Sequence, residues 1–371
     1  TVKEAFRRND ADPLSTVGVT TGIWSSLSAS LTSTRTLGAD DAPALREHRV
    51  SVRTCGALYR QWRKTKPEYR DAPEDGVVVD IPFVFTRWDD GGGSGGRRPL
   101  AVVLHGAPGG YGDFSENLVP RLRAAGVDVL VPNLPGMAFS LQNKFFWHSI
   151  EERTALLKDF LKEMNITRID ALVAHSAAIF PSLRITLEEP GAAPAVKSLA
   201  LLAPNSILTP KTLEPLWLTR RIVRAYRRFP LLRPLVGAVV RTAHSLGLSP
   251  LKPVVEDFML SVTTYLESRY AESSPLLEAV SLRRLPTLVA ISRDDRLLPY
   301  PVLLAVCTTL GAGEEDMWCF GPDGQLRRPG KPDSWLKVVC FDKGSHYPFI
   351  KQPDVCADEI LQLLRRIGSL S

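Results

Sequence analysis

The sequence predicts an α/β fold with a mostly parallel sheet that is covered by helices on both faces. From residue 99 onward, six short apolar runs recur along the chain. Amphipathic helical patterns separate most of these runs, as in SIEERTALLKDFLKEM and, near the C-terminus, in PDVCADEILQLLRRIG. Strands of a parallel sheet are buried on both faces and therefore read as continuous apolar runs, and this alternation with helices is typical of such a sheet.

The expected core strands are AVVLH, VDVLVPN, DALVAHS, SLALLAP, TLVAIS and LKVVCFD. In parallel sheets, binding and reaction sites form beyond the carboxyl ends of the strands. The residues that directly follow each run are therefore the first candidates for a functional site.

The bulk composition bounds the class of protein. The chain has 371 residues, of which 44% are hydrophobic and 23% charged, as in an ordinary globular protein. This length is enough for one large domain plus an accessory element, or for two medium domains. No run approaches 18 consecutive apolar residues, so we expect no membrane-spanning helix. The chain begins with Thr1 rather than Met. We therefore expect an upstream piece to be missing, and a signal or transit peptide within it stays open.

The cysteines predict no disulfide framework and no metal site. There are five, their spacing is irregular, and Cys340 lies within the apolar run LKVVCF. Buried free thiols in a reducing compartment are the expectation, which favours the cytoplasm with mitochondria as the alternative. No CxxC or HExxH spacing occurs among the cysteines and histidines.

The first 70 residues are expected to be an N-terminal extension, partly disordered or helical. Residues 15–38 contain 12 Ser or Thr and read as a loop or tail, whereas residues 42–64 are predicted to form an amphipathic helix. The next two apolar segments, GVVVDIPFVFTRW and PLAVVLHG, are joined by a glycine-rich loop and predict an antiparallel hairpin.

That loop formally matches G-x-G-x-x-G at Gly91, Gly93 and Gly96. A dinucleotide-binding fingerprint must open a helix, because the pyrophosphate lies at the helix N-terminus. Here a strand follows instead, so the glycines are interpreted as a turn.

A candidate nucleophile follows the strand DALVAHS. The strand ends in Ala174-His175-Ser176-Ala177-Ala178 and leads into a helical pattern. A serine on a tight strand-to-helix turn needs small residues two positions before and after it, usually glycines in G-x-S-x-G. Both positions are alanine here, and an ordinary buried or capping serine is the alternative interpretation.

The strand AVVLH ends in His105-Gly106-Ala107-Pro108-Gly109. At this point the sequence resembles the α/β-hydrolase family, in which an HGxPG loop follows the third strand. The resemblance implies an oxyanion hole made by the backbone N–H groups of Ala107 and Ala177. It continues through Pro132-Asn133-Leu134-Pro135-Gly136-Met137-Ala138, where the family usually has Asp for Asn133 and Gly for Ala138. A simple Gly/Pro turn is the alternative for the HGAPG segment.

A serine hydroxyl becomes a nucleophile only when a base accepts its proton, and an acid must hold that base in one tautomer. The run LKVVCFD leads to Lys343-Gly344-Ser345-His346, which resembles the family's histidine loop, with a surface-turn histidine as the alternative. Two carboxylates, Asp294 and Asp295, follow TLVAIS. The family's pattern selects Asp295, and Asp294 is the alternative. The order Ser, Asp, His is the one that the fold requires.

The separation of Asp295 and His346 is longer than the family usually shows. Residues 311–335 account for it and are predicted to be an inserted loop or hairpin near the site. Together with the two alanines beside Ser176, this long gap motivates the alternative of a catalytically degenerate member.

Residues 208–285 are predicted to form a basic helical cap over the site, where the family commonly inserts a lid. They contain 12 Lys and Arg against 6 Asp and Glu, a balance of +6 that equals the net charge of the whole chain. A solvated lid face is one interpretation. Contact with an anionic lipid or membrane surface is the second, and no nucleic acid is expected because no nucleic-acid-binding module accompanies the charge.

The resemblance implies an α/β-hydrolase core formed by residues 75–207 and 286–371. It also implies a serine hydrolase, esterase-like or lipase-like, that cleaves a carboxylic ester of a small-molecule acyl substrate without metal or organic cofactor. The serine disfavours dehalogenase and epoxide hydrolase chemistry, which in this fold begins from an aspartate. The alternatives are a non-catalytic binding protein with the same fold, and an acyltransferase that uses the same residues.

Overall fold

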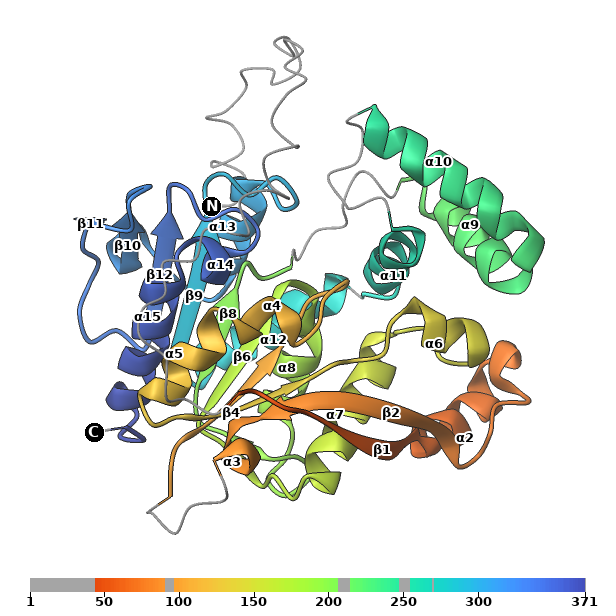
Figure 1. The fold of residues 1–371 in the computed structure, drawn as a ribbon, viewed down its shortest axis with the longest axis horizontal. Helices are drawn as coiled ribbons and strands as arrows, with labels where there is room; N and C mark the ends of the chain where they lie inside the picture. The colour runs from red at the N-terminus through yellow and green to blue at the C-terminus, as the bar shows by residue number, and fades with distance from the viewer. Residues whose placement is uncertain (1–43, 91–96, 206–213, 247–253, 269, 371) are drawn as a thin grey trace. The chain divides into compact units, whose positions relative to one another are not determined.

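A ten-stranded sheet organises the protein (Figure 1). The computed structural model describes residues 44–90, 97–205, 214–246, 254–268 and 270–370. In sheet order, the strands are β1 (Glu47–Cys55), β2 (Gly76–Phe85), β4 (Asp128–Pro132), β3 (Leu100–Leu104), β6 (Ala171–His175), β8 (Leu199–Leu202), β9 (Thr287–Ser292), β12 (Leu336–Phe341), β10 (Met317–Phe320) and β11 (Leu326–Arg328).

The central strands are parallel, as predicted. All neighbouring pairs from β4 to β10 run in the same direction, whereas β2 and β11 are antiparallel to their neighbours. A second, two-stranded sheet pairs β5 (Arg168–Ile169) with β7 (Ala195–Val196). The six apolar runs of the sequence correspond to β3, β4, β6, β8, β9 and β12. The predicted α/β class is confirmed.

Helices cover both faces of the sheet because alternate strand residues point to opposite sides. In β3, Val102 and Leu104 belong to one apolar cluster, and Ala101 and Val103 belong to another. The first cluster includes residues of α2 (Gly56–Thr65), α7 (Ile150–Glu163), α8 (Ile179–Leu187), α12 (Tyr270–Leu282) and α13 (Tyr300–Thr309). The second includes residues of α4 (Gly112–Ser115), α5 (Leu118–Ala124), α14 (Pro348–Lys351) and α15 (Pro353–Arg366).

Two expectations for the N-terminal part are wrong. The predicted helix over residues 42–64 is strand β1 followed by the shorter helix α2. The predicted hairpin between GVVVDIPFVFTRW and PLAVVLHG does not form, because β2 pairs with β1 and β4, while β3 pairs with β4 and β6. The Ser/Thr-rich stretch 15–38 and the glycines at 91, 93 and 96 lie outside the described residues.

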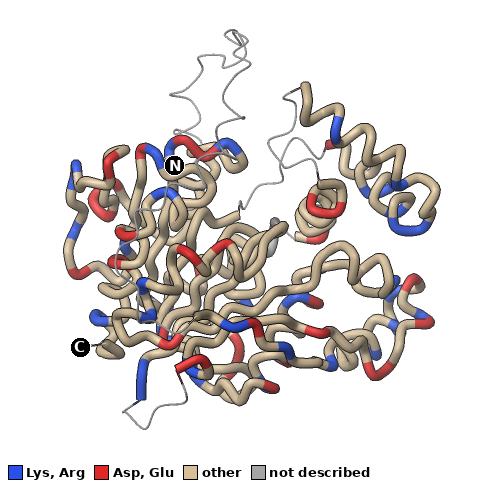
Figure 2. Tube along the Cα trace, in the orientation of Figure 1, with Lys and Arg blue, Asp and Glu red and all other residues tan. Residues whose placement is uncertain are grey.

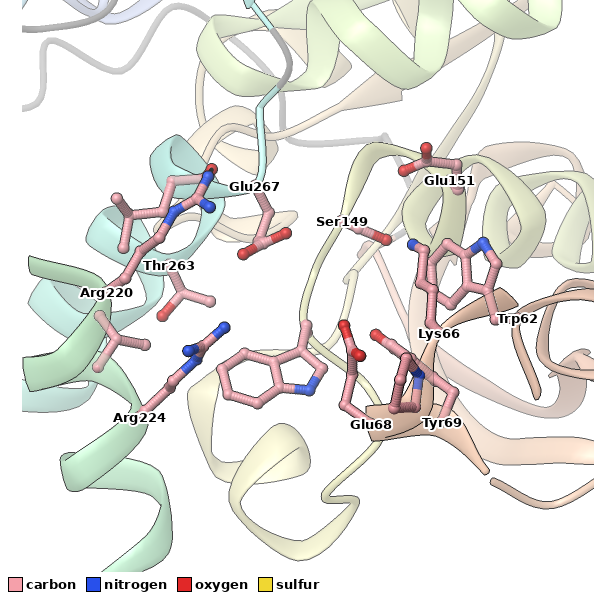
Figure 3. Close-up of a pocket in the computed structure, with 14 residues that line it drawn as sticks. Trp62, Lys66, Glu68, Tyr69, Ser149, Glu151, Arg220, Arg224, Thr263 and Glu267 are labelled. Atoms are coloured by element: carbon pink, nitrogen blue, oxygen red, sulfur yellow. Dashed lines mark hydrogen bonds between the residues drawn. The ribbon is translucent and has the colours of Figure 1, made fainter. Parts of the chain in front are cut away.

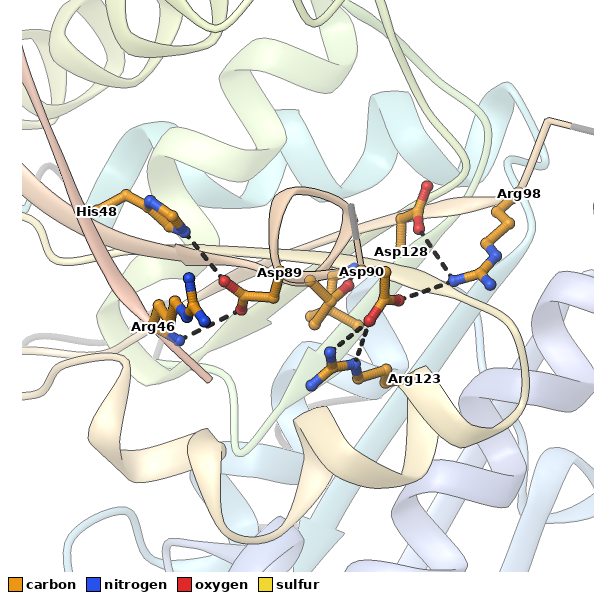
Figure 4. A network of polar contacts seen from close by, with 9 residues as sticks. Arg46, His48, Asp89, Asp90, Arg98, Arg123 and Asp128 are labelled. Carbon is orange, nitrogen blue, oxygen red and sulfur yellow. Dashed lines mark hydrogen bonds and ion pairs between the residues drawn. The ribbon is translucent and has the colours of Figure 1, made fainter. Parts of the chain in front are cut away.

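A polar network connects the start of β1 with the segment that follows β2 (Figure 4). The short helix α3 (Thr86–Asp89) and the residue after it supply two carboxylates. Asp89 accepts hydrogen bonds from the backbone N–H of Arg46 at 3.3 Å and from His48 Nε2 at 3.1 Å. Asp90 accepts from the guanidinium groups of Arg98 and Arg123, and the Arg123 interaction lowers the pKa of Asp90. This network ties the start of β1 to the end of β2.

The chain between β8 and β9 forms a helical insertion, whose described helices are α9 (Leu216–Arg228), α10 (Arg233–Ser245), α11 (Val255–Leu266) and α12. Both α9 and α10 contact α11, and α11 contacts α6 (Met137–Gln142), which follows β4 (Figure 1). A separate apolar cluster lies between them and includes Val223, Tyr226, Met259 and Met137. Helices α9 and α10 therefore pack on α11, which contacts α6, whereas α12 packs directly on α8 of the core.

Residues 311–335 contain a hairpin, as expected, because β10 and β11 pair in antiparallel fashion. This hairpin extends the sheet beyond β12. All five cysteines are unpaired, and four of them are buried, with Cys319 partly exposed.

Candidate active site

The turn after β6 holds Ser176 in a strained backbone conformation. Ser176 has a φ of 52°, in the left-handed region that a residue with a Cβ rarely adopts, and a 3₁₀ turn (η3, Ser176–Ala178) then leads into α8. Ala174 and Ala178, the residues at the two usual glycine positions, are fully buried. The structure thus forms a sharp strand-to-helix turn, with alanine two positions before and two positions after the serine.

Three predicted residues from three strand ends meet at this turn. His346 Nε2 lies 3.0 Å from Ser176 Oγ, and His346 Nδ1 lies 2.8 Å from Asp295 Oδ2. Because a carboxylate only accepts, Nδ1 carries the proton, which leaves Nε2 free to accept from the serine hydroxyl. All three side chains are buried. Their catalytic roles stay predictions.

Backbone groups orient the carboxylate of Asp295. Its second oxygen, Oδ1, accepts hydrogen bonds from the N–H groups of Leu297 and Leu298 at 2.8 and 2.9 Å. Asp294, the alternative acid, does not contact the imidazole. Its Oδ1 accepts from the backbone N–H groups of Gly344 and Ser345 at 2.9 Å each, so it fixes the loop that carries His346.

His175 also holds the histidine loop. Its Nε2 donates to the backbone carbonyl of His346 at 3.0 Å, and the two rings lie 5.0 Å apart. Burial lowers the pKa of His175 well below its ordinary value, with a smaller effect from His346 in the same direction. A neutral imidazole is therefore packed under the candidate base. The sequence placed His175 in the turn but gave it no role.

The loop after β3 passes directly against the serine. A Cβ on Gly106 would lie 3.0 Å from the Ser176 Cβ and 3.2 Å from His175 Nδ1, so any larger residue there would require these neighbours to shift. His105 Nδ1 donates to the Gly106 carbonyl at 2.7 Å, and His105 Nε2 accepts from the Leu134 N–H at 2.8 Å. The peptide between Gly106 and Ala107 carries the Ala107 N–H, and His105 thus fixes the orientation of that candidate donor. Burial lowers the pKa of His105 to about 4, which keeps the ring neutral.

The rest of the loop turns beside His105. Gly109 lies close enough that a Cβ there would come 3.1 Å from the His105 Cβ, and Pro108 joins it to Ala107. The predicted residues His105 to Gly109 therefore lie together beside the serine turn.

The second candidate donor is held in a similar way. The Ala177 N–H belongs to the peptide whose carbonyl, that of Ser176, accepts from the Asn205 N–H at 3.2 Å. The Ala177 carbonyl in turn accepts from Arg153 Nη2 at 3.1 Å. Arg153 is buried on α7, and burial lowers its pKa to about 10, so the guanidinium is still positive at neutral pH. A fixed positive charge thus lies behind the turn.

Helix α11 of the insertion reaches the same site. Ser261 Oγ donates to the Ala107 carbonyl at 3.0 Å. Tyr265, one turn further along, lies near the Ser176 side chain, and burial raises the pKa of its phenol to about 12. Sequence reasoning missed Tyr265. No local motif marks it, because only the packing of α11 on the core brings residue 265 to residue 176.

A cavity of about 440 Å³, here called the insertion cavity, lies between the insertion and the N-terminal part of the core (Figure 3). Trp62, Trp147 and Tyr69 provide aromatic walls. Arg220 and Arg224 of α9 line it together with Glu267, whose pKa is raised by burial and lowered in part by these arginines. None of the three candidate catalytic residues lines this cavity.

Within the described residues, no group of His, Cys, Asp and Glu side chains is arranged to hold a metal ion.

No helix in the described part of the chain combines the length and the apolar character that crossing a bilayer requires.

The comparisons with known proteins agree with this architecture. Residues 101–359 match the family described as the alpha/beta hydrolase family. This match covers more than half of the chain, and the protein belongs to that family. Comparison with curated protein sequences finds no match.

Similar solved structures show the same fold at low sequence identity. Haloalkane dehalogenase DbeA from Bradyrhizobium elkani is 12% identical with a TM-score of 0.52, and the alignment covers 88% of this chain and 100% of that chain. Rv0554 from Mycobacterium tuberculosis is 15% identical with a TM-score of 0.50, over 81% of this chain and 97% of that chain. At these identities, the likeness concerns the fold alone.

Proposed function

We propose that the protein is a serine hydrolase that cleaves a carboxylic ester or related acyl bond, with Ser176 as nucleophile, His346 as base and Asp295 as the orienting acid. The observation that carries the proposal is the continuous hydrogen-bonded series from Ser176 through His346 to Asp295. Each member follows a different strand, so this alignment is not a consequence of local sequence. No cofactor is part of the proposal.

In the first step, Ser176 Oγ attacks the substrate carbonyl carbon while His346 Nε2 accepts the hydroxyl proton. Asp295 stabilises the resulting imidazolium, because its Oδ2 accepts from Nδ1–H. The tetrahedral intermediate then expels the alcohol, which receives the proton from His346. Water, deprotonated by the same Nε2, attacks the acyl-serine, and collapse releases the carboxylic acid and restores Ser176. One water is consumed, and one acid and one alcohol are formed.

The Ala107 and Ala177 N–H groups are proposed to bind the oxyanion. Preorganised donors of this kind contribute about 10²–10³ in rate each, because they need no reorganisation as the charge develops. The contacts of His105 and Asn205 support this role, since they fix the peptide planes that carry the two N–H groups. The positive charge of Arg153 behind Ala177 favours negative charge in the same region.

A haloalkane dehalogenase activity is disfavoured, although a structure of that name shares the fold. Hydrolases of that kind begin from an aspartate in this turn, whereas this chain has Ser176. The two alanines beside the serine gave the sequence-based reason to consider a non-catalytic protein. The positive φ of Ser176 and the contact with His346 weigh against that alternative.

Labelling with a fluorophosphonate probe tests the proposal. The wild type should be labelled, and Ser176→Ala should not. Ser182→Ala is the matched control, because Ser182 lies on α8 and its hydroxyl donates to the Ala178 carbonyl within the helix. Ser182→Ala should keep its labelling. A panel of esters of graded acyl length then defines the substrate, and product analysis with alcohol acceptors separates hydrolysis from acyl transfer.

Two results would overturn the proposal. A folded wild type that is neither labelled nor active on any ester of the panel would favour a binding protein. Labelling that persists in Ser176→Ala would show that another residue is the nucleophile.

A further inference from the structure

The surface formed by α9, the turn Pro230–Leu232 (η5) and α10, residues 216–246, exposes an unusual amount of apolar side chain. Among the described residues, sixteen large apolar side chains are exposed, and ten of them lie in this docking surface. They are Leu216, Trp217, Leu218, Ile222, Phe229, Leu231, Leu232, Leu235, Val239 and Leu246. Such a concentration of exposed apolar side chains in one segment favours an interaction site over ordinary surface variation.

The exposed residues follow helical spacing on both helices. On α9, Leu218 and Ile222 are separated by four positions, and on α10, Leu235 and Val239 repeat this separation. Phe229 and Leu246 directly follow the two helices. The opposite sides face inward, since Val223 and Tyr226 of α9 are buried against α11 and Val236 of α10 packs beside them. Each helix therefore has apolar residues that pack within the insertion and further apolar residues that are exposed to solvent.

The connection between the helices is the most exposed apolar point. Leu231 is 92% exposed, and Phe229 before it is 50% exposed. Both lie at the turn η5, which reverses the chain between the two helices. A protruding apolar corner of this kind is suited to enter a nonpolar medium.

All Asp, Glu, Lys and Arg side chains within residues 216–246 are arginines. No Asp or Glu lies between Glu214 and Glu256. Of the arginines there, Arg220 and Arg224 line the insertion cavity together with Glu267, and so they belong to the inner side (Figure 3).

The outer arginines are Arg221, Arg228 and Arg241, all exposed. Positively charged positions recur along α9 and α10 in the charge-coloured trace (Figure 2). In the described part of the chain, none of the three forms an ion pair with a carboxylate. Arg221 lies over the Trp217 ring at 5.1 Å, and Arg228 lies over Phe229 at 5.8 Å. Arginine next to exposed aromatic and leucine side chains is the composition of helices that lie in a membrane interface.

We propose that the docking surface binds an anionic phospholipid surface, with the corner at Leu231 inserted among the acyl chains and the outer arginines on the headgroup phosphates. A second copy of this chain would bring the same uncompensated positive charge against itself. An anionic bilayer supplies both the apolar medium and the opposite charge.

Vesicle co-sedimentation tests this proposal without any use of catalysis. The full chain is mixed with vesicles of phosphatidylcholine alone, or of phosphatidylcholine with phosphatidylglycerol, at about 0.1 M and about 1 M salt, where the Debye length falls from about 10 Å to 3 Å. We expect binding to the anionic vesicles only, weakened at high salt. Ser176→Ala should bind like the wild type, which separates this proposal from the proposed function.

Two matched pairs of variants locate the contact. Leu231→Asp should abolish binding, whereas Leu326→Asp, at an exposed leucine of β11, should not. The double variant R221Q/R228Q should bind about 30-fold more weakly, since each arginine near an anionic surface contributes a factor of roughly five. The double variant R53Q/R328Q, which removes two exposed arginines elsewhere, should bind like the wild type.

Three outcomes would overturn the proposal. These are absence of binding to anionic vesicles, equal binding to neutral ones, and equal effects of the docking-surface and control variants. A separate test is sedimentation velocity of the protein without lipid. A dimer that dissociates in Leu231→Asp would assign the surface to a second copy of the chain.

Discussion

The strained backbone of Ser176 leads to a stability prediction that is independent of activity. A residue with a Cβ in the left-handed region costs about 1–2 kcal/mol, and Ser176 has a φ of 52°. Glycine at this position removes that cost. Ser176→Ala and Ser176→Gly both lose the hydroxyl and its contact with His346, so the difference between them reports the backbone and the Cβ alone.

Two other effects of glycine must be separated from the strain. Glycine costs about 0.5–1 kcal/mol in conformational entropy relative to alanine, and the loss of a buried methyl group costs about 0.8 kcal/mol. Ala178 provides the control, because it is equally buried, follows two residues later and has a φ of −71°. Ala178→Gly should therefore destabilise the protein by about 1.5 kcal/mol. The change from alanine to glycine at 176 should cost close to zero, because the relief of strain offsets both terms.

The measurement is the free energy of unfolding from urea denaturation of the wild type, the two Ser176 variants and Ala178→Gly. The two alanine-to-glycine differences should differ by roughly 1–2 kcal/mol. If glycine is as costly at 176 as at 178, the turn stores no strain and this reasoning is wrong.

Three further predictions concern the site and its support. Asp295→Asn should lower kcat by about 10³–10⁴, because the imidazole is no longer held in the required tautomer. Asp294→Asn keeps an acceptor for the loop N–H groups and should lower kcat by about tenfold or less. Equal losses of kcat in steady-state kinetics would contradict the assignment of Asp295 as the acid. Tyr265→Phe should lower kcat about tenfold with little change in KM if its hydroxyl acts on Ser176 in the transition state, and a change in KM alone would instead indicate substrate binding. Burial raises the pKa of Glu152 to about 7, so the folded state binds the proton more tightly than the unfolded chain and stability should fall by roughly 3 kcal/mol as pH rises from 4.5 to 7. Glu152→Gln, in which the amide can donate to Tyr59, should flatten this slope in urea titrations, and an unchanged slope would refute the linkage.

The sequence predicted the parallel core because its signal is local. Each of the six strands is a short apolar run that is bounded by turn residues, and burial on both faces of a sheet requires that composition. The segments after β3, β6, β9 and β12 were found for the same reason: the candidate residues lie at strand ends, where a parallel sheet brings them to one edge. Ser176, Asp295 and His346 were named from these positions together with the resemblance to the α/β-hydrolase family, and the fold places them in contact.

Strand pairing at the edge of the sheet was not predictable in this way. The apolar pattern of β2 is satisfied equally well by β3 or by β1 as a partner, and neighbours in sequence are the natural first choice. The tertiary structure instead inserts β4 between β2 and β3 and adds β1 outside. Pairing between strands far apart in the chain depends on how the whole sheet packs, which no window of the sequence contains.

The sequence by itself determined the fold class, the family resemblance and the residue types at the strand ends, because local composition and spacing specify them. Only the tertiary structure decided what surrounds Ser176. The contact of His175 with the histidine loop, the position of Arg153 behind Ala177 and the position of Tyr265 near Ser176 arise from long-range packing. Their positions depend on contacts between elements that are distant in the chain, and the chemistry of the site depends on those positions.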